Sequence, residues 1–151
     1  MKTLVLIDDN KDDLLFIKEA LASIDPDIQS LSFIYSEEAM TALMCKILDG
    51  PTAVFMNLNM PRRNGIQCLM ELRTNPGFDA LPVFLYTPKI TIEVVEALKG
   101  SGITTAFEKP DTMLGWKKIM RAMLTSMDSP TVNFRALFKN SSLYIEFPSN
   151  E

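Results

Sequence analysis

The stretch Leu4-Val-Leu-Ile-Asp-Asp-Asn10 decides the fold, because it joins an uninterrupted apolar run to two adjacent carboxylates. Four apolar residues in succession are typical of a strand that is buried on both faces of a parallel sheet. Asp8 and Asp9 follow where that strand ends. Ligands of open α/β sheets bind beyond the carboxyl ends of the strands, so this stretch predicts both a fold and the position of a site.

Short apolar runs and helix-periodic segments alternate along the rest of the chain. Apolar residues three or four positions apart mark helices, whereas continuous apolar runs between turn residues mark buried strands. Five strands that alternate with five helices predict an α/β fold: a doubly wound, five-stranded parallel sheet in the flavodoxin-like order 2-1-3-4-5, with helices on both faces. The expected strands are residues 3–7, 31–35, 53–56, 81–86 and 104–107; the expected helices are residues 14–24, 37–48 (with Ser36 as N-cap), 66–74, 92–99 and 112–127.

The pattern changes near the end of the chain, which divides it into a domain of residues 1–127 and an extension of residues 128–151. Apolar and polar residues alternate in residues 132–138 and again in residues 143–147, and the four residues between have the composition of a turn. This pattern is compatible with a β-hairpin. Because an isolated hairpin is only marginally stable, we expect it to pack on the domain or on another copy of the chain.

Charge and composition narrow the range of functions. The formal net charge is -4, so bulk electrostatics favours neither a nucleic acid nor an anionic membrane as partner. No stretch reaches the roughly eighteen apolar residues of a membrane span, and the N-terminal run is too short for a signal peptide, so we expect a cytoplasmic protein. The chain has no histidine, and Cys45 and Cys68 lie in separate apolar segments. This indicates two reduced, buried thiols rather than a disulfide or a zinc site.

Polar side chains with complementary chemistry stand where the predicted strands end. Asp8 and Asp9 follow the first strand, Asn57 the third, Thr87 the fourth and Lys109 the fifth. Carboxylate and carbonyl oxygens suit Mg²⁺, and a hydroxyl and an ammonium group suit phosphate oxygens. Each residue alone has an ordinary alternative as a helix cap, a strand residue or a surface lysine. Their convergence at one edge of the sheet indicates a site for a cation and a phosphate.

Four stretches carry a resemblance to a known family: Leu4 to Asn10, Asn57-Leu-Asn-Met-Pro-Arg-Arg-Asn-Gly65, Leu85-Tyr-Thr87, and Gly102 through Lys109-Pro110. In this order and spacing they resemble the receiver domain of two-component response regulators. The resemblance covers about residues 2–124 and is strongest to small stand-alone regulators.

The resemblance implies roles for the residues at the strand ends. Asp8 and Asp9 would form the acidic pair, with Asp9 as the direct Mg²⁺ ligand, and the backbone carbonyl of Asn59 would be a further ligand. Thr87 and Lys109 would hold the phosphoryl oxygens.

Two departures from the family bear on function. Asn57 stands where the family has its phosphate-accepting aspartate, and an amide oxygen is a very poor nucleophile. The loss of a negative charge beside the metal also predicts weak Mg²⁺ binding. Ala106 occupies the position of the family's switch aromatic, with Phe107 after it, and Pro88 stiffens the loop that follows Thr87.

The leading hypothesis is a receiver-like signalling module of a phosphorelay that is not phosphorylatable and acts by protein–protein interaction. Its partner would be a sensor kinase or a downstream signalling protein, bound on the face of residues 92–127, which would also suit a homodimer aided by the extension. The alternative is a phospho-accepting single-domain regulator with another acceptor, such as Thr87 or a pocket aspartate, or with a Mg²⁺-dependent switch. A third hypothesis, an enzyme of the same fold, lacks a glycine-rich phosphate loop, a nucleophile elbow and a catalytic cysteine context, so we expect no catalysis.

Overall fold

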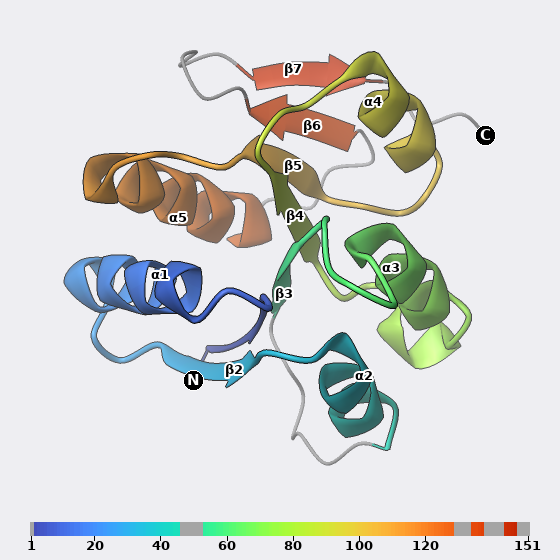
Figure 1. The fold of residues 1–151 in the computed structure, drawn as a ribbon, viewed down its shortest axis with the longest axis horizontal. Coiled ribbons are helices and arrows are strands. Elements are labelled where there is room, and N and C mark those ends of the chain that lie inside the picture. The colour runs from blue at the N-terminus through green and yellow to red at the C-terminus, as the bar shows by residue number, and fades with distance from the viewer. Residues whose placement is uncertain (1, 46–52, 129–133, 138–143, 148–151) are drawn as a thin grey trace.

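The computed structural model describes residues 2–45, 53–128, 134–137 and 144–147, and its strands and helices alternate along the chain (Figure 1). The strands are β1 (Thr3–Ile7), β2 (Gln29–Phe33), β3 (Ala53–Asn57), β4 (Val83–Thr87), β5 (Thr105–Glu108), β6 (Phe134–Leu137) and β7 (Tyr144–Phe147). The helices are α1 (Lys11–Ile24), α2 (Ser36–Met44), α3 (Gly65–Arg73), α4 (Ile92–Leu98) and α5 (Met113–Asp128), with a 3-10 turn, η1, at Pro76–Phe78.

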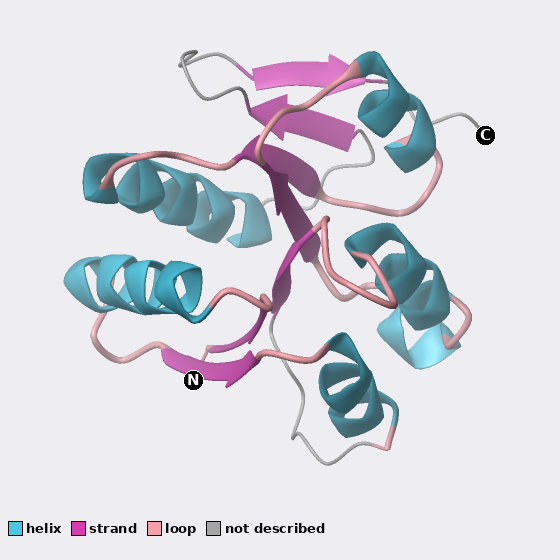
Figure 2. Ribbon diagram, viewed as in Figure 1, coloured by secondary structure: helices cyan, strands magenta, loops and turns pink. Residues whose placement is uncertain are grey.

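All seven strands belong to one sheet, whose order is β2-β1-β3-β4-β5-β6-β7. The first five strands are parallel, which confirms the predicted order 2-1-3-4-5. Helices α1 and α5 lie on one face of the sheet, and α2, α3 and α4 lie on the other (Figures 1 and 2). The carboxyl ends of β1, β3, β4 and β5 therefore meet at one edge, as the doubly wound arrangement requires.

Two apolar layers fill the space between the sheet and the helices. Alternate side chains of a strand point to opposite faces, so each buried strand contributes to both layers. The layer under α2, α3 and α4 includes Val5, Ile7, Val54, Leu85 and Ala106. The layer under α1 and α5 is richer in aromatic rings and includes Phe55, Phe84, Tyr86, Phe107 and Trp116.

The region around α2 differs from the prediction. Ser36 is the first residue of the helix rather than its cap, and its hydroxyl donates to the carbonyl oxygen of Arg63 at 3.2 Å. Cys45, just after the helix, is exposed rather than buried, whereas Cys68 is buried as predicted. Residues 46–48, the predicted end of this helix, lie outside the described residues. Within the described ranges, no helix is long and apolar enough to span a membrane.

The C-terminal extension adds two strands to the predicted five-stranded sheet, within the two stretches whose alternating pattern is compatible with a β-hairpin. Strand β6 pairs in parallel with β5, and β7 pairs antiparallel with β6. Ala136 of β6 is fully buried and belongs to the layer under α2, α3 and α4. Pairing with β6 satisfies the backbone groups along the edge of β5, which would otherwise be exposed. The predicted turn, residues 139–142, lies outside the described residues.

Candidate functional site

The site begins where β1 ends and α1 starts. The Asp8 residue is fully buried, while the next residue, Asp9, is exposed. Asn10 is the N-cap of α1, because its side-chain oxygen accepts hydrogen bonds from the backbone N–H groups of Asp12 and Asp13. Successive side chains of an extended segment point in opposite directions, so Asp8 points into the protein while Asp9 points toward solvent.

Asp8 is surrounded by neutral hydrogen-bond donors. The Tyr86 hydroxyl donates to Asp8 Oδ2 at 2.5 Å. Oδ1 accepts from the backbone N–H of Asn10 at 2.9 Å and from Asn57 Nδ2 at 3.3 Å. Burial raises the pKa of Asp8 to about 6, although these hydrogen bonds favour the ionised form and oppose the rise.

Three polar residues at or just after the ends of β3 and β4 are linked by hydrogen bonds. Asn57 uses both ends of its amide, because Nδ2 donates to Asp8 and Oδ1 accepts from the backbone N–H of Asn59 at 3.1 Å. The Asn59 side chain in turn donates to Thr87 Oγ1 at 3.2 Å. Asn57, Asn59 and Thr87 therefore form one chain of hydrogen bonds across the strand ends.

A glycine permits the close turn after β3. A Cβ atom on Gly65 would lie 2.8 Å from Leu85 Cδ2 and 2.9 Å from the carbonyl oxygen of Asn57. Asn64 closes the turn with a capping box at the start of α3, in which its side chain and that of Gln67 each bond to the other's backbone N–H. The backbone beside Asn57 is thus fixed by steric fit and by the cap together.

Lys109 forms an ion pair with Asp13, a residue that the sequence analysis did not single out. Its Nζ lies 2.5 Å from Asp13 Oδ2, and the side chains are 32% and 9% exposed, respectively. This Asp13 oxygen accepts no well-aligned hydrogen bond from a described residue, so the ammonium group compensates it electrostatically. The helical periodicity of the sequence could have indicated this pair. Asp13 lies one turn before Ile17 on the buried side of α1, and a buried carboxylate there needs a charged or hydrogen-bonding partner.

Tyr86 is the second site residue that the sequence analysis missed. It is fully buried, its ring lies 4.7 Å from that of Phe55, and Trp116 meets it edge-on at 5.5 Å. Burial and the neighbouring Asp8 raise the pKa of Tyr86 well above its usual value, so the hydroxyl keeps its proton. A buried tyrosine hydroxyl requires a polar partner, and that requirement was the signal available in the sequence.

Two further positions depart from the pattern that the resemblance implies. Ala106 stands at the position of the switch aromatic, and Pro88 lies in the loop after β4. Ala106 is buried beside Leu85, on the sheet face under α2, α3 and α4. Phe107 points to the opposite face, where its ring lies 6.0 Å from that of Phe55. The Glu108 carboxylate accepts a hydrogen bond from the backbone N–H of Ile90 at 2.9 Å, which ties the loop after β4 to β5.

The proposed metal ligands, Asp8, Asp9 and Asn59, do not make a good cation site together. Both oxygens of Asp8 already accept hydrogen bonds, and Asp9 is the exposed carboxylate of the pair. In the part of the chain that the structure describes, no three His, Cys, Asp or Glu side chains form a group that could hold a metal ion. Mg²⁺ keeps several water ligands and needs only one or two protein carboxylates, but Asp8 is already engaged by three hydrogen bonds and Asn57 adds no charge, so these residues fit the ion poorly.

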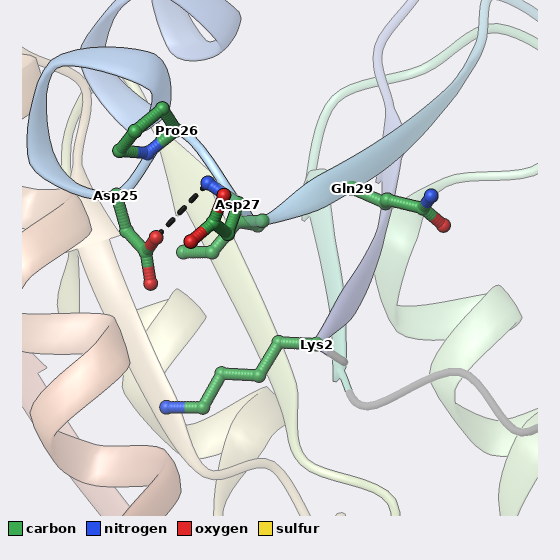
Figure 3. Close-up of a pocket in the computed structure, with 6 residues that line it drawn as sticks. Lys2, Asp25, Pro26, Asp27 and Gln29 are labelled. Atoms are coloured by element: carbon green, nitrogen blue, oxygen red, sulfur yellow. Dashed lines mark hydrogen bonds between the residues drawn. The ribbon is translucent and has the colours of Figure 1, made fainter.

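A hollow lies away from this site, between β1 and the turn that precedes β2 (Figure 3). Its labelled lining residues are Lys2, Asp25, Pro26, Asp27 and Gln29. Asp25 accepts a hydrogen bond from the backbone N–H of Asp27 at 3.0 Å, which is a local turn contact. The Asp25 side chain thus stabilises the turn before β2.

Residues 4–121 match the family model of the response regulator receiver domain. The chain belongs to the response regulator receiver family. No curated protein sequence matches this receiver domain.

Solved receiver structures share its fold. The phosphorylated cyanobacterial phytochrome response regulator RcpA is 22% identical, with a TM-score of 0.77 over 86% of this chain and 96% of its own. The Mn²⁺-bound response regulator Rcp1 is 20% identical, with a TM-score of 0.75 over 87% and 98%. The chemotaxis response regulator CheY4 of Vibrio cholerae is 18% identical, with a TM-score of 0.67 over 82% and 98%.

Proposed function

We propose that this receiver domain signals without accepting a phosphoryl group and acts by binding another protein. The observation that carries the proposal is the state of Asn57 at the acceptor position. Its amide nitrogen donates to Asp8 and its amide oxygen accepts from Asn59, so both polar atoms are already engaged. A phosphoryl acceptor needs an electron-rich oxygen that is free to attack, and Asn57 offers none.

The neighbouring oxygens are poor substitutes for the missing aspartate. Thr87 is almost fully buried and its hydroxyl oxygen accepts from Asn59. Asp8 is fully buried and its carboxylate accepts three hydrogen bonds. RcpA was solved in a phosphorylated form, so the fold is compatible with the modification, and the local chemistry at Asn57 is what opposes it here.

The partner surface of this proposal is the face formed by α4, β5 and α5. Ile92 at the start of α4 is 79% exposed and Leu114 at the start of α5 is 67% exposed. Because β6 occupies the edge of β5 and the two helices lie on opposite faces of the sheet, a partner would bind the exposed side of α4 or of α5 rather than add a strand to β5. A sensor kinase or a downstream signalling protein in the cytoplasm fits this role, and a second copy of the chain is the other candidate. The protein would act there without catalysis.

Intact-mass measurement after treatment with acetyl phosphate and Mg²⁺ tests the proposal. We expect no phosphoryl increment on the natural protein, with Asn57→Asp as the comparison variant. A single phosphoryl group on Thr87 or on a pocket aspartate would favour the alternative, a regulator that uses another acceptor.

Binding measurements test how the face works. Self-association and partner affinity should be the same with and without acetyl phosphate, because Asn57 gains no phosphoryl group and therefore no added negative charge. Ala106→Tyr should change partner affinity through altered fit and should not create a response to the phosphodonor. A donor-dependent change in the natural protein contradicts the proposal.

A further inference from the structure

Asp8 is a buried carboxylate that has no positive partner among the described residues. Lys109, which the family resemblance directed toward the acidic pair, forms its ion pair with Asp13 instead. The donors around Asp8 are the Tyr86 hydroxyl, the Asn57 amide and the backbone N–H of Asn10, and all three are neutral. The negative charge of Asp8 is therefore held by hydrogen bonds alone.

We propose that Tyr86 and Asn57 take over, by hydrogen bonding to Asp8, the stabilising role that a divalent cation plays in an acidic crevice, so that the site stays assembled without a metal ion. Tyr86 is a positioning residue in this proposal, since it acts through Asp8. The inference shares Asn57 with the proposed function but does not depend on phosphorylation or on a partner.

The position of Tyr86 is fixed independently of Asp8. The ring is fully buried between Phe55 and Trp116, which direct the hydroxyl toward Asp8 Oδ2. A carboxylate has about four lone-pair positions, and three of those on Asp8 are occupied by donors. A cation that used Asp8 as a ligand would find only one position left, on Oδ2, and would have to share that oxygen with the Tyr86 hydroxyl, whose ring is held by aromatic contacts.

Asn57 contributes in a second way, because an aspartate there would add a negative charge 3.3 Å from Asp8 Oδ1, at the position now held by Nδ2. Two carboxylates so close disfavour joint ionisation unless a cation lies between them. With the amide in place, that repulsion is replaced by an attraction. The demand for a cation is thus lowered at both oxygens of Asp8.

Metal titration of four proteins tests the inference: the natural protein, Tyr86→Phe, Asn57→Asp and the control Tyr35→Phe, whose tyrosine is 55% exposed. Each is stripped with EDTA and titrated with Mg²⁺ to about 10 mM, a range in which a ligand that binds only the folded state raises the melting temperature. Trp116, the single tryptophan, lies against Tyr86 and reports on the site by fluorescence. Binding of Mn²⁺, measured by electron paramagnetic resonance, gives an affinity that does not require unfolding.

We expect neither Mg²⁺-dependent stabilisation nor saturable Mn²⁺ binding for the natural protein and for Tyr35→Phe. Tyr86→Phe and Asn57→Asp should each bind Mn²⁺ at least about tenfold more tightly and recover melting temperature with Mg²⁺. Saturable Mn²⁺ binding by the natural protein as tight as that of Asn57→Asp overturns the inference. So does a Tyr86→Phe variant that responds to metal no more than the control. Should Tyr86→Phe fail to fold, the comparison of the natural protein with Asn57→Asp still decides the matter. Phosphorylation of the natural protein would contradict the proposed function while leaving these metal measurements intact.

Discussion

Replacing Asp8 by asparagine should stabilise the protein at neutral pH and leave its stability nearly unchanged near pH 4. The native pKa of Asp8 is raised from 3.8 to about 6 by burial. The folded state therefore binds this proton more tightly than the unfolded state does. The favourable contribution of the neutral carboxyl is fully present below about pH 4 and is lost as the pH rises through 6.

The size of the effect follows from the raised pKa. Each tenfold change in proton affinity is worth about 1.4 kcal/mol, so the difference between 3.8 and about 6 corresponds to about 3 kcal/mol at pH 8. Asparagine fits the same contacts: its oxygen can accept from Asn10 and Asn57, and its nitrogen can donate to the Tyr86 hydroxyl oxygen.

Urea unfolding of both proteins in EDTA, followed by circular dichroism and Trp116 fluorescence, measures the effect. Points at pH 4, 6, 7 and 8 avoid the isoelectric region near 4.9, where solubility is lowest. Other titrating groups cancel in the difference between variant and natural protein. That difference should grow by about 2–2.5 kcal/mol from pH 4 to pH 8, because the unfolded carboxyl is already partly ionised at pH 4. A difference that is independent of pH, or a variant that is less stable than the natural protein at pH 8, would refute the reasoning.

Three further substitutions probe the rest of the site. Without metal, Asn57→Asp should lower the free energy of unfolding by about 1–3 kcal/mol through carboxylate repulsion, and Mg²⁺ should restore part of it; an equal or higher apo melting temperature contradicts this. Lys109→Met should cost about 1–3 kcal/mol, measured by urea unfolding, because it leaves the buried Asp13 carboxylate unpaired, and Asp13→Asn in the same background should recover much of that loss. Gly65→Ala should cost about 1–3 kcal/mol, because the added methyl group lies 2.8 Å from Leu85 Cδ2, and unchanged thermal stability would mean that the turn adapts freely.

The order of the first five strands could be predicted because their chemistry is local. Strands β1, β3 and β4 are buried on both faces, so their sequences are continuous apolar runs that end abruptly at polar residues. Strand β2 was misplaced by two residues because it lies at an edge of the sheet, where exposed and half-buried residues alternate. Its position is fixed by hydrogen bonding to β1 rather than by hydrophobicity.

The candidate site was predictable in its location but not in its contacts. Asp8, Asn57, Thr87 and Lys109 converge because parallel strands end at one edge. The partner of Asp8, however, is Tyr86, which lies 78 residues away within an apolar strand. Such pairings depend on which faces of separate elements meet in space, and no short-range pattern encodes that. For the same reason, the positions of the strand ends alone could not predict that Lys109 pairs with Asp13 on α1.

The pairing of β6 with β5 has a consequence for how the protein is produced in the laboratory. A chain shortened to the end of α5 would keep every residue matched by the receiver family model, and sequence comparison would therefore suggest it as a minimal domain. Such a chain would lose the parallel partner of β5. It would also expose the apolar surface that Ala136 now covers. Exposed strand edges of this kind recruit strands from other molecules. The shortened chain should precipitate or form soluble aggregates at concentrations where the full chain stays dispersed.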